Sequence, residues 1–106
     1  FDPRWKFLAE WKGPLIGRPY GVSPGAAGHI YAIDGGDGPL KRQDRPRAVE
    51  LDREGRVLDR FGAFGTEPGQ FVLGHDIAVA RDGAVYVADA TGNRVQKFVR
   101  KAGTKP

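Results

Sequence analysis

Residues 75–98 read HDIAVARDGAVYVADATGNRVQKF, and this stretch decides the fold. Three short runs rich in β-branched and aromatic residues are separated by RDG at 81–83 and ATGN at 90–93. Clusters of Asp, Gly and Asn between such runs are typical of tight hairpin turns. The stretch therefore predicts antiparallel strands at 75–80, 84–89 and 94–99.

The rest of the chain repeats this pattern of short apolar runs and turn residues. Gly55, at the end of the turn DREG, occupies a hairpin position that favours positive φ. No window of about 12 residues has the periodicity of an amphipathic helix. The chain is predicted to be all-β, with further strands at 6–11, 19–23, 29–34, 47–52 and 56–61.

An internal repeat groups these strands into two units. Residues 30–34 match 85–89 at an offset of 55, whereas 47–49 match 94–96 at an offset of 47, so the first unit carries eight extra residues between its second and third strands. The run FLAEW at the N-terminus likewise matches VLDRF, the fourth strand of the first unit. A four-stranded unit repeated every 40–50 residues or so is typical of β-propeller blades.

The repeat predicts a single two-blade propeller unit over residues 1–106. Residues 1–13 are expected to form an outer strand that completes a neighbouring blade. The first blade spans 14–62, and the second blade, without its outer strand, spans 63–106. Two blades alone would leave a large apolar sheet face at each end. Either the unit belongs to a longer chain, or copies assemble into a ring, in which case a homotrimer gives six blades.

Composition excludes several classes of function. The chain has 106 residues, a formal net charge of +4 and 40% hydrophobic residues, which is ordinary for one small globular domain. It has no Cys, so disulfides, thiolate metal sites and cysteine nucleophiles are excluded. Its one serine, Ser23, lacks the surrounding motif of a serine hydrolase. No apolar run is long enough for a membrane-spanning helix.

Several motifs together resemble one known repeat, the NHL repeat. They are FGAFGTEPGQF at 61–71, HDIAV at 75–79, VYVAD at 85–89 and NRVQKF at 93–98. The resemblance covers most of the chain and is strongest over 55–99. Within that class, the phrase GHDIAV is most similar to the peptidyl-α-hydroxyglycine α-amidating lyases. That resemblance implies a six-bladed β-propeller that holds a catalytic zinc through three His, one from every second blade.

The resemblance also assigns roles to individual positions. His75 falls on a zinc-ligand position, Asp76 falls on the acidic residue that follows it, and the same position in the other repeat is Tyr20. The catalytic Arg of the lyases is Ala90 here, and their Tyr is Gly36. A three-fold ring would bring three copies of the His ligand around one axis. We therefore predict one zinc per trimer, with weak or no lyase activity.

Each candidate residue also has a purely structural interpretation. His75 can be a solvated residue at the mouth of a channel, and His29 is predicted to be a surface residue at the start of a strand. Asp34 and Asp89 resemble the paired carboxylates of an acid–base mechanism. They are better explained as caps of the turns that follow their strands, because Asp at a strand end accepts backbone N–H bonds.

The insertion GGDGPLKRQDRP at 35–46 adds a cluster of cations near the candidate zinc ligand. The predicted ligand rim comprises Tyr20, Lys41, Arg42, Arg45 and Asp76. A basic rim suits a peptide or a small anionic ligand, whereas RNA binding would rest on charge alone, and the insertion can equally be a solvated loop. The alternatives to a lyase-like zinc propeller are a non-catalytic peptide-, protein- or RNA-binding module and a symmetric scaffold. The resemblance is compatible with a secreted or periplasmic location.

Overall fold

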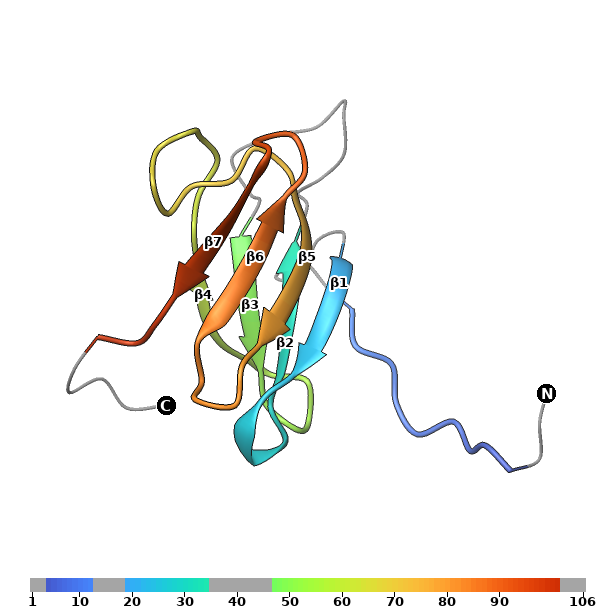
Figure 1. The fold of residues 1–106 in the computed structure, drawn as a ribbon. Coiled ribbons are helices and arrows are strands. Elements are labelled where there is room, and N and C mark those ends of the chain that lie inside the picture. Colours follow the sequence, from blue (N-terminus) through green and yellow to red (C-terminus); the bar gives the residue numbers. More distant parts are fainter. Residues whose placement is uncertain (1–3, 13–18, 35–46, 102–106) are drawn as a thin grey trace.

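The computed structural model describes residues 4–12, 19–34 and 47–101, which form two antiparallel β-sheets (Figure 1). The strands are β1 (Pro19–Pro24), β2 (Ile30–Asp34), β3 (Arg47–Leu51), β4 (Val57–Phe61), β5 (Gly74–Val79), β6 (Val85–Asp89) and β7 (Arg94–Phe98). The first sheet has the order β1-β2-β3-β4 and the second has the order β5-β6-β7. A short 3-10 turn, Ala26–Gly28, lies between β1 and β2. Nowhere in the described ranges does a helix reach the length and apolarity needed to cross a membrane.

The strands lie where the sequence pattern predicts them, with each end displaced by one residue at most. The turns follow the predicted chemistry, since Gly55 and Gly83 have φ angles of 86° and 94°. The third hairpin turn places Asn93 in the left-handed region, with φ 56°, and Asn is among the few side chains that tolerate this conformation. The prediction of an all-β chain is confirmed.

The two sheets pack face to face around one hydrophobic core. β5 contacts both β1 and β2, so the sheets approach most closely at their first strands. The backbone N–H of Val79 donates to the Ser23 hydroxyl at 3.1 Å, which ties the facing strands together. The core contains buried side chains of both sheets and of the connection between them: Ile33, Ala48, Phe71, Ile77, Val85 and Val87.

The N-terminal arm, residues 4–12, differs from the prediction. Residues 6–11 were expected to form a strand, but the arm forms no strand in the single chain and leaves the body on the side of β1 (Figure 1). Its first apolar side chains are exposed, with Trp5 at 72%, Phe7 at 75% and Leu8 at 80%, whereas Trp11 is 38% exposed and lies against Gly55 in the turn between β3 and β4. A strand needs a neighbouring strand to pair its backbone N–H and C=O groups, and among the described residues the arm pairs with no sheet edge.

The second sheet ends at β7, where the first sheet continues to β4. Within the described residues no strand pairs with the outer edge of β7. Val95 on this strand is 68% exposed, and Val99 just beyond it is 69% exposed. The second sheet is therefore the first sheet without its fourth strand.

Candidate functional site

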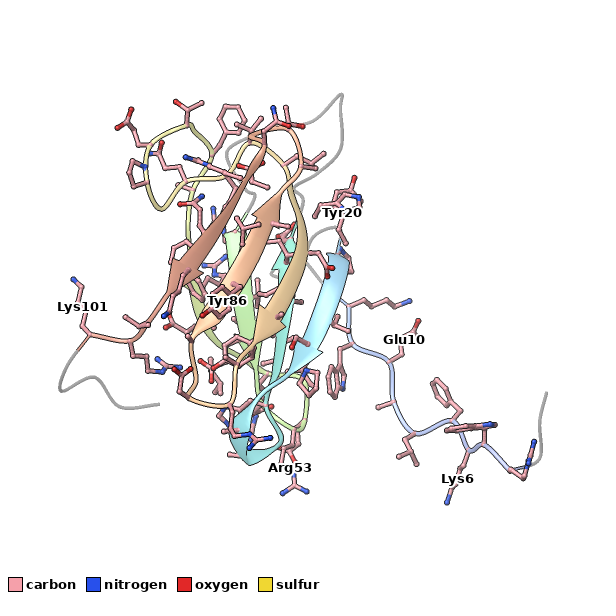
Figure 2. All side chains as sticks on the ribbon, in the orientation of Figure 1. Lys6, Glu10, Tyr20, Arg53, Tyr86 and Lys101 are labelled. Atoms are coloured by element: carbon pink, nitrogen blue, oxygen red, sulfur yellow. The ribbon has the colours of Figure 1, made fainter. Side chains whose placement is uncertain are left out.

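The structure brings together three of the predicted site residues where β1 and β5 begin. The rings of Tyr20 and His75 stack with their centroids 5.3 Å apart and their planes at 26°. A side chain at Gly21 would collide with the Asp76 carboxylate, so β1 passes close beside β5 at this point. All three candidate side chains reach solvent. Figure 2 shows Tyr20 at the start of β1.

The rim residues of one chain do not fit a zinc site. Zinc takes four ligands in proteins, three of them from protein side chains when it is catalytic. Among the residues that the structure describes, no three His, Cys, Asp or Glu side chains lie close enough to hold a metal ion. His75 is the single imidazole at this rim, and Asp76 instead accepts a hydrogen bond of 2.9 Å from the backbone N–H of Ile77. Further ligands would have to come from other copies of the chain.

The remaining predicted rim residues belong to the insertion between β2 and β3. Lys41, Arg42 and Arg45 belong to the insertion 35–46, which lies outside the described residues, and so does Gly36. Ala90 is exposed, and its backbone N–H donates to the carbonyl of Leu73 at 2.9 Å.

Asp89 is a structural residue, as its turn-capping interpretation predicts. Its carboxylate is 1% exposed and accepts backbone N–H bonds from Val72, Leu73 and Gly92, at 2.9, 2.9 and 3.0 Å. Burial would raise the pKa of this carboxyl, but the three backbone donors outweigh it and hold the pKa below its usual value. Asp34 is equally buried at the end of β2, and the turn that follows it lies outside the described residues.

The polar residues of β7 hold the connection between the sheets in place. The Arg94 guanidinium donates to the carbonyls of Thr66 and Gln70, at 2.9 and 2.6 Å. The Gln96 amide donates to the Gln70 carbonyl at 2.7 Å and accepts from the N–H of Gly69 at 2.8 Å. The motifs PGQF and NRVQ therefore belong to one hydrogen-bonded unit that fixes the loop onto the strand.

A buried charged cluster joins the two sheets, and sequence reasoning missed it. Glu50 in β3 is 2% exposed, and its carboxylate accepts from Arg100, which follows β7, at 2.5 Å. The other carboxylate oxygen lies 2.7 Å from Nδ1 of His29. The prediction that His29 is a surface residue is therefore wrong: its side chain is 21% exposed and contacts a buried acid. The one local signal was an acidic residue inside the apolar strand RAVEL.

The electrostatics of this cluster favour the ionised carboxylate. Burial alone would raise the pKa of Glu50, but the hydrogen bonds from His29 and Arg100 together hold it below the usual 4.5. A buried carboxylate that is paired in this way is costly to break, because removing a partner leaves a charge in a poorly solvated site.

A groove between the sheets lies beside β7, at the opposite edge from the N-terminal arm. It has a volume of about 290 Å³ and is mostly apolar, with Tyr31, Phe61, Val85 and Phe98 on its walls and Arg100 at one side. The Phe61 and Phe98 rings are 5.0 Å apart and come from the two different sheets. The groove is thus the outer end of the hydrophobic core, left open where the second sheet stops at three strands.

Comparison with known proteins agrees with the repeat read from the sequence. Residues 75–98, which run from the second residue of β5 to the end of β7, match the NHL repeat. The chain is 34% identical over 76 residues to NHL repeat-containing protein 3 of Homo sapiens, and equally to that of Mus musculus. The match covers 72% of this chain and 20% of each relative, so the chain spans about a fifth of the length of the relatives it matches. The second sheet accordingly matches the NHL repeat, in a chain that is similar to part of NHL repeat-containing protein 3.

Proposed function

We propose that this chain is a non-catalytic building unit of an NHL-type β-propeller, and that three copies close a ring of six blades. The observation that carries this proposal is the difference in strand number between the two sheets. Among the described residues, the second sheet repeats the first three strands of the first sheet and ends at β7. Residues 1–13 of one copy supply the missing outer strand to the next copy. Such a contact joins unlike surfaces, and rotation closes it into a ring.

The open face of the second sheet supports the same arrangement. Tyr31 and Glu50 are paired across β2 and β3, on the face of the first sheet that packs against the second. The repeat-equivalent pair across β6 and β7 is Tyr86 and Lys97. These side chains turn away from the core, because Val85, Val87 and Phe98 between and beside them point into it. Figure 2 shows Tyr86 on this face of β6. This sheet face is buried in the first blade and open in the second, so a further blade packed against the second would bury it in the same way.

Native mass spectrometry of the 106-residue chain tests the ring. We expect a folded species of about three times 11.5 kDa, because two blades per copy reach six blades at three copies. Substituting Ser23→Ala, within the chain rather than at the proposed interface, should leave this mass unchanged. A folded monomer contradicts the assembly, and a dimer or tetramer contradicts the number of blades.

The same sample tests the zinc predicted from the sequence. In a three-fold ring the three copies of His75 are equidistant from the axis, and they stand where the innermost strands begin. We expect one zinc per three chains, lost in the His75→Ala variant and kept in Tyr20→Phe. Elemental analysis of protein purified without chelator or nickel measures it. Far less than one metal per three chains would show that the imidazoles lie too far apart to share an ion.

Amidating-lyase activity is not proposed for this chain. The lyase-like phrase at His75 is not accompanied by the family's Arg and Tyr, whose positions hold Ala90 and Gly36. The rim of Tyr20, His75 and Asp76 is instead proposed as the ligand-facing mouth of the central channel, since all three side chains lie together and reach solvent.

A further inference from the structure

The open edge of β7 and the groove beside it together have the features of a docking site for an extended peptide. Among the described residues, the edge offers backbone groups that pair with no strand, and the groove offers an apolar cavity of about 290 Å³ lined by residues of both sheets. Edge addition of a strand combines main-chain hydrogen bonds with pockets for alternate side chains. Which segment occupies this site depends on the assembly proposed above.

The first sheet shows how a fourth strand fits this site. There β4 runs antiparallel to β3 and places Phe61 opposite Ala48, Asp59 opposite Glu50 and Val57 opposite Leu51. A register shift between the last two pairs leaves Leu58 as an extra residue, and it is 48% exposed. Val57 packs against a second cluster of buried apolar residues in the first sheet, Ala32, Val49 and Leu51.

The internal repeat transfers this register to the second sheet. The run FLAEW at 7–11 matches VLDRF at 57–61, and β7 matches β3. We propose that residues 7–11 of a second copy of this chain bind along β7 as an antiparallel strand. The register pairs Trp11 with Val95, Ala9 with Lys97 and Phe7 with Phe98.

Phe7 is the side chain that fills the groove. Directly opposed residues of an antiparallel pair share one face of the sheet. Phe98 faces the first sheet, where it contacts Phe61 and Phe71, and it is a wall of the groove. A Phe7 opposite it enters the same space, as Val57 enters the cluster beside Leu51 in the complete sheet. Leu8 corresponds to the extra, exposed Leu58 and stays outside.

The arm suits this role because the single chain leaves its first apolar side chains uncovered. Phe7 is 75% exposed and Leu8 is 80% exposed. The arm leaves the body beside β1, whereas β7 lies at the opposite edge (Figure 1), so the arm is placed to reach another copy. Figure 2 shows Lys6 far out on the arm, on the side of the molecule away from Lys101.

Disulfide trapping between full-length chains tests the register. The chain has no Cys, so each variant carries one thiol. Ala9→Cys chains are mixed with Lys97→Cys chains and oxidised, and the linked heterodimer is measured by non-reducing electrophoresis. Directly opposed residues lie within the Cα distance that a disulfide spans.

The matched control is Val95→Cys, two residues along the same exposed face of β7. We expect it to link to the Ala9→Cys chain at least about tenfold less than the Lys97→Cys chain does, because the diagonal neighbour lies farther away than the opposed residue. Equal linking of both pairs, or no linking, overturns the register.

A second pair of variants tests the groove. Each substitution is introduced into the Ala9→Cys chain, which is then mixed with the Lys97→Cys chain and oxidised. Phe7→Ala should lower the yield of linked heterodimer about tenfold, whereas Leu8→Ala should leave it nearly unchanged. Equal losses from both would overturn the placement of Phe7.

These experiments distinguish an error in the docking site from an error in the ring assembly. A trimer that forms no link between positions 9 and 97 contradicts this docking site alone. A specific link in a sample without trimers contradicts the ring and leaves the docking site standing.

Discussion

Replacing Phe71 by alanine is expected to destabilise the fold by about 3–5 kcal/mol. Phe71 has no exposed surface and packs in the core between the sheets, with its ring 5.7 Å from that of Phe98 in an edge-to-face arrangement. Gly62, with φ 95°, has room for no side chain because the Phe71 ring occupies that space. Truncation leaves a cavity that the connection cannot close without breaking its own bonds to β7.

Urea unfolding followed by the far-ultraviolet circular dichroism of the β-sheets measures this loss at fixed protein concentration. Phe64→Ala is the matched control, since it makes the same chemical change in the same connection, at a residue that is 40% exposed. We expect that control to cost no more than about 1 kcal/mol. A loss of similar size in both variants would contradict the assignment of Phe71 to the core. Domains of this size have total stabilities of about 5–15 kcal/mol, so the Phe71 variant should populate unfolded chains at low urea.

Replacing Glu50 by alanine is expected to cost about 1.5–3 kcal/mol, because it removes the charge-assisted hydrogen bonds that Arg100 and His29 make to this buried carboxylate. Arg100 also lies 3.8 Å from Asp59, which is half-exposed and does not replace the lost carboxylate. The control is Glu54→Ala, in an exposed pair with Arg56 whose loss should cost less than about 1 kcal/mol. Urea midpoints that fall equally for Glu50 and Glu54 would contradict a buried link between the sheets.

The same residue makes stability depend on pH. Its pKa in the folded chain lies below the usual 4.5, so the folded state favours the ionised form. This contribution is fully present above the unfolded pKa and is lost as the pH falls through the folded pKa. The urea midpoint of the wild type should therefore fall on acidification below about pH 4.5, and it should fall less steeply in Glu50→Gln. Parallel curves for the two chains would place the acid sensitivity elsewhere, for example at Asp89.

Local residue patterns were sufficient to predict the strands and their turns. Short runs rich in β-branched and aromatic residues, bounded by turn residues, predict each observed strand to within one residue at either end, because such side chains suit a pleated sheet. Gly55 and Gly83 predict their hairpins because their positive φ is an intrinsic property of the turn. The capping role of Asp89 follows equally from its position at a strand end.

Local residue patterns predicted only part of the arrangement at the ligand rim. The repeat placed Tyr20 and His75 at equivalent strand starts, and the structure brings their rings into contact. The contact itself was not predicted, because it depends on how closely β1 and β5 approach across the two sheets.

By itself the sequence determined the β class, the hairpins and the match of residues 75–98 to the NHL repeat, because these depend on residues that are close together along the chain. The tertiary structure decided the contacts between residues far apart. Arg100 contacts Glu50 although fifty positions separate them along the chain, and no sequence pattern around either residue predicts this contact. It also decided that FLAEW, which has the pattern of a strand, forms none in the single chain. A strand exists only where an unpaired sheet edge accepts its hydrogen bonds, and that depends on which edges the fold leaves open.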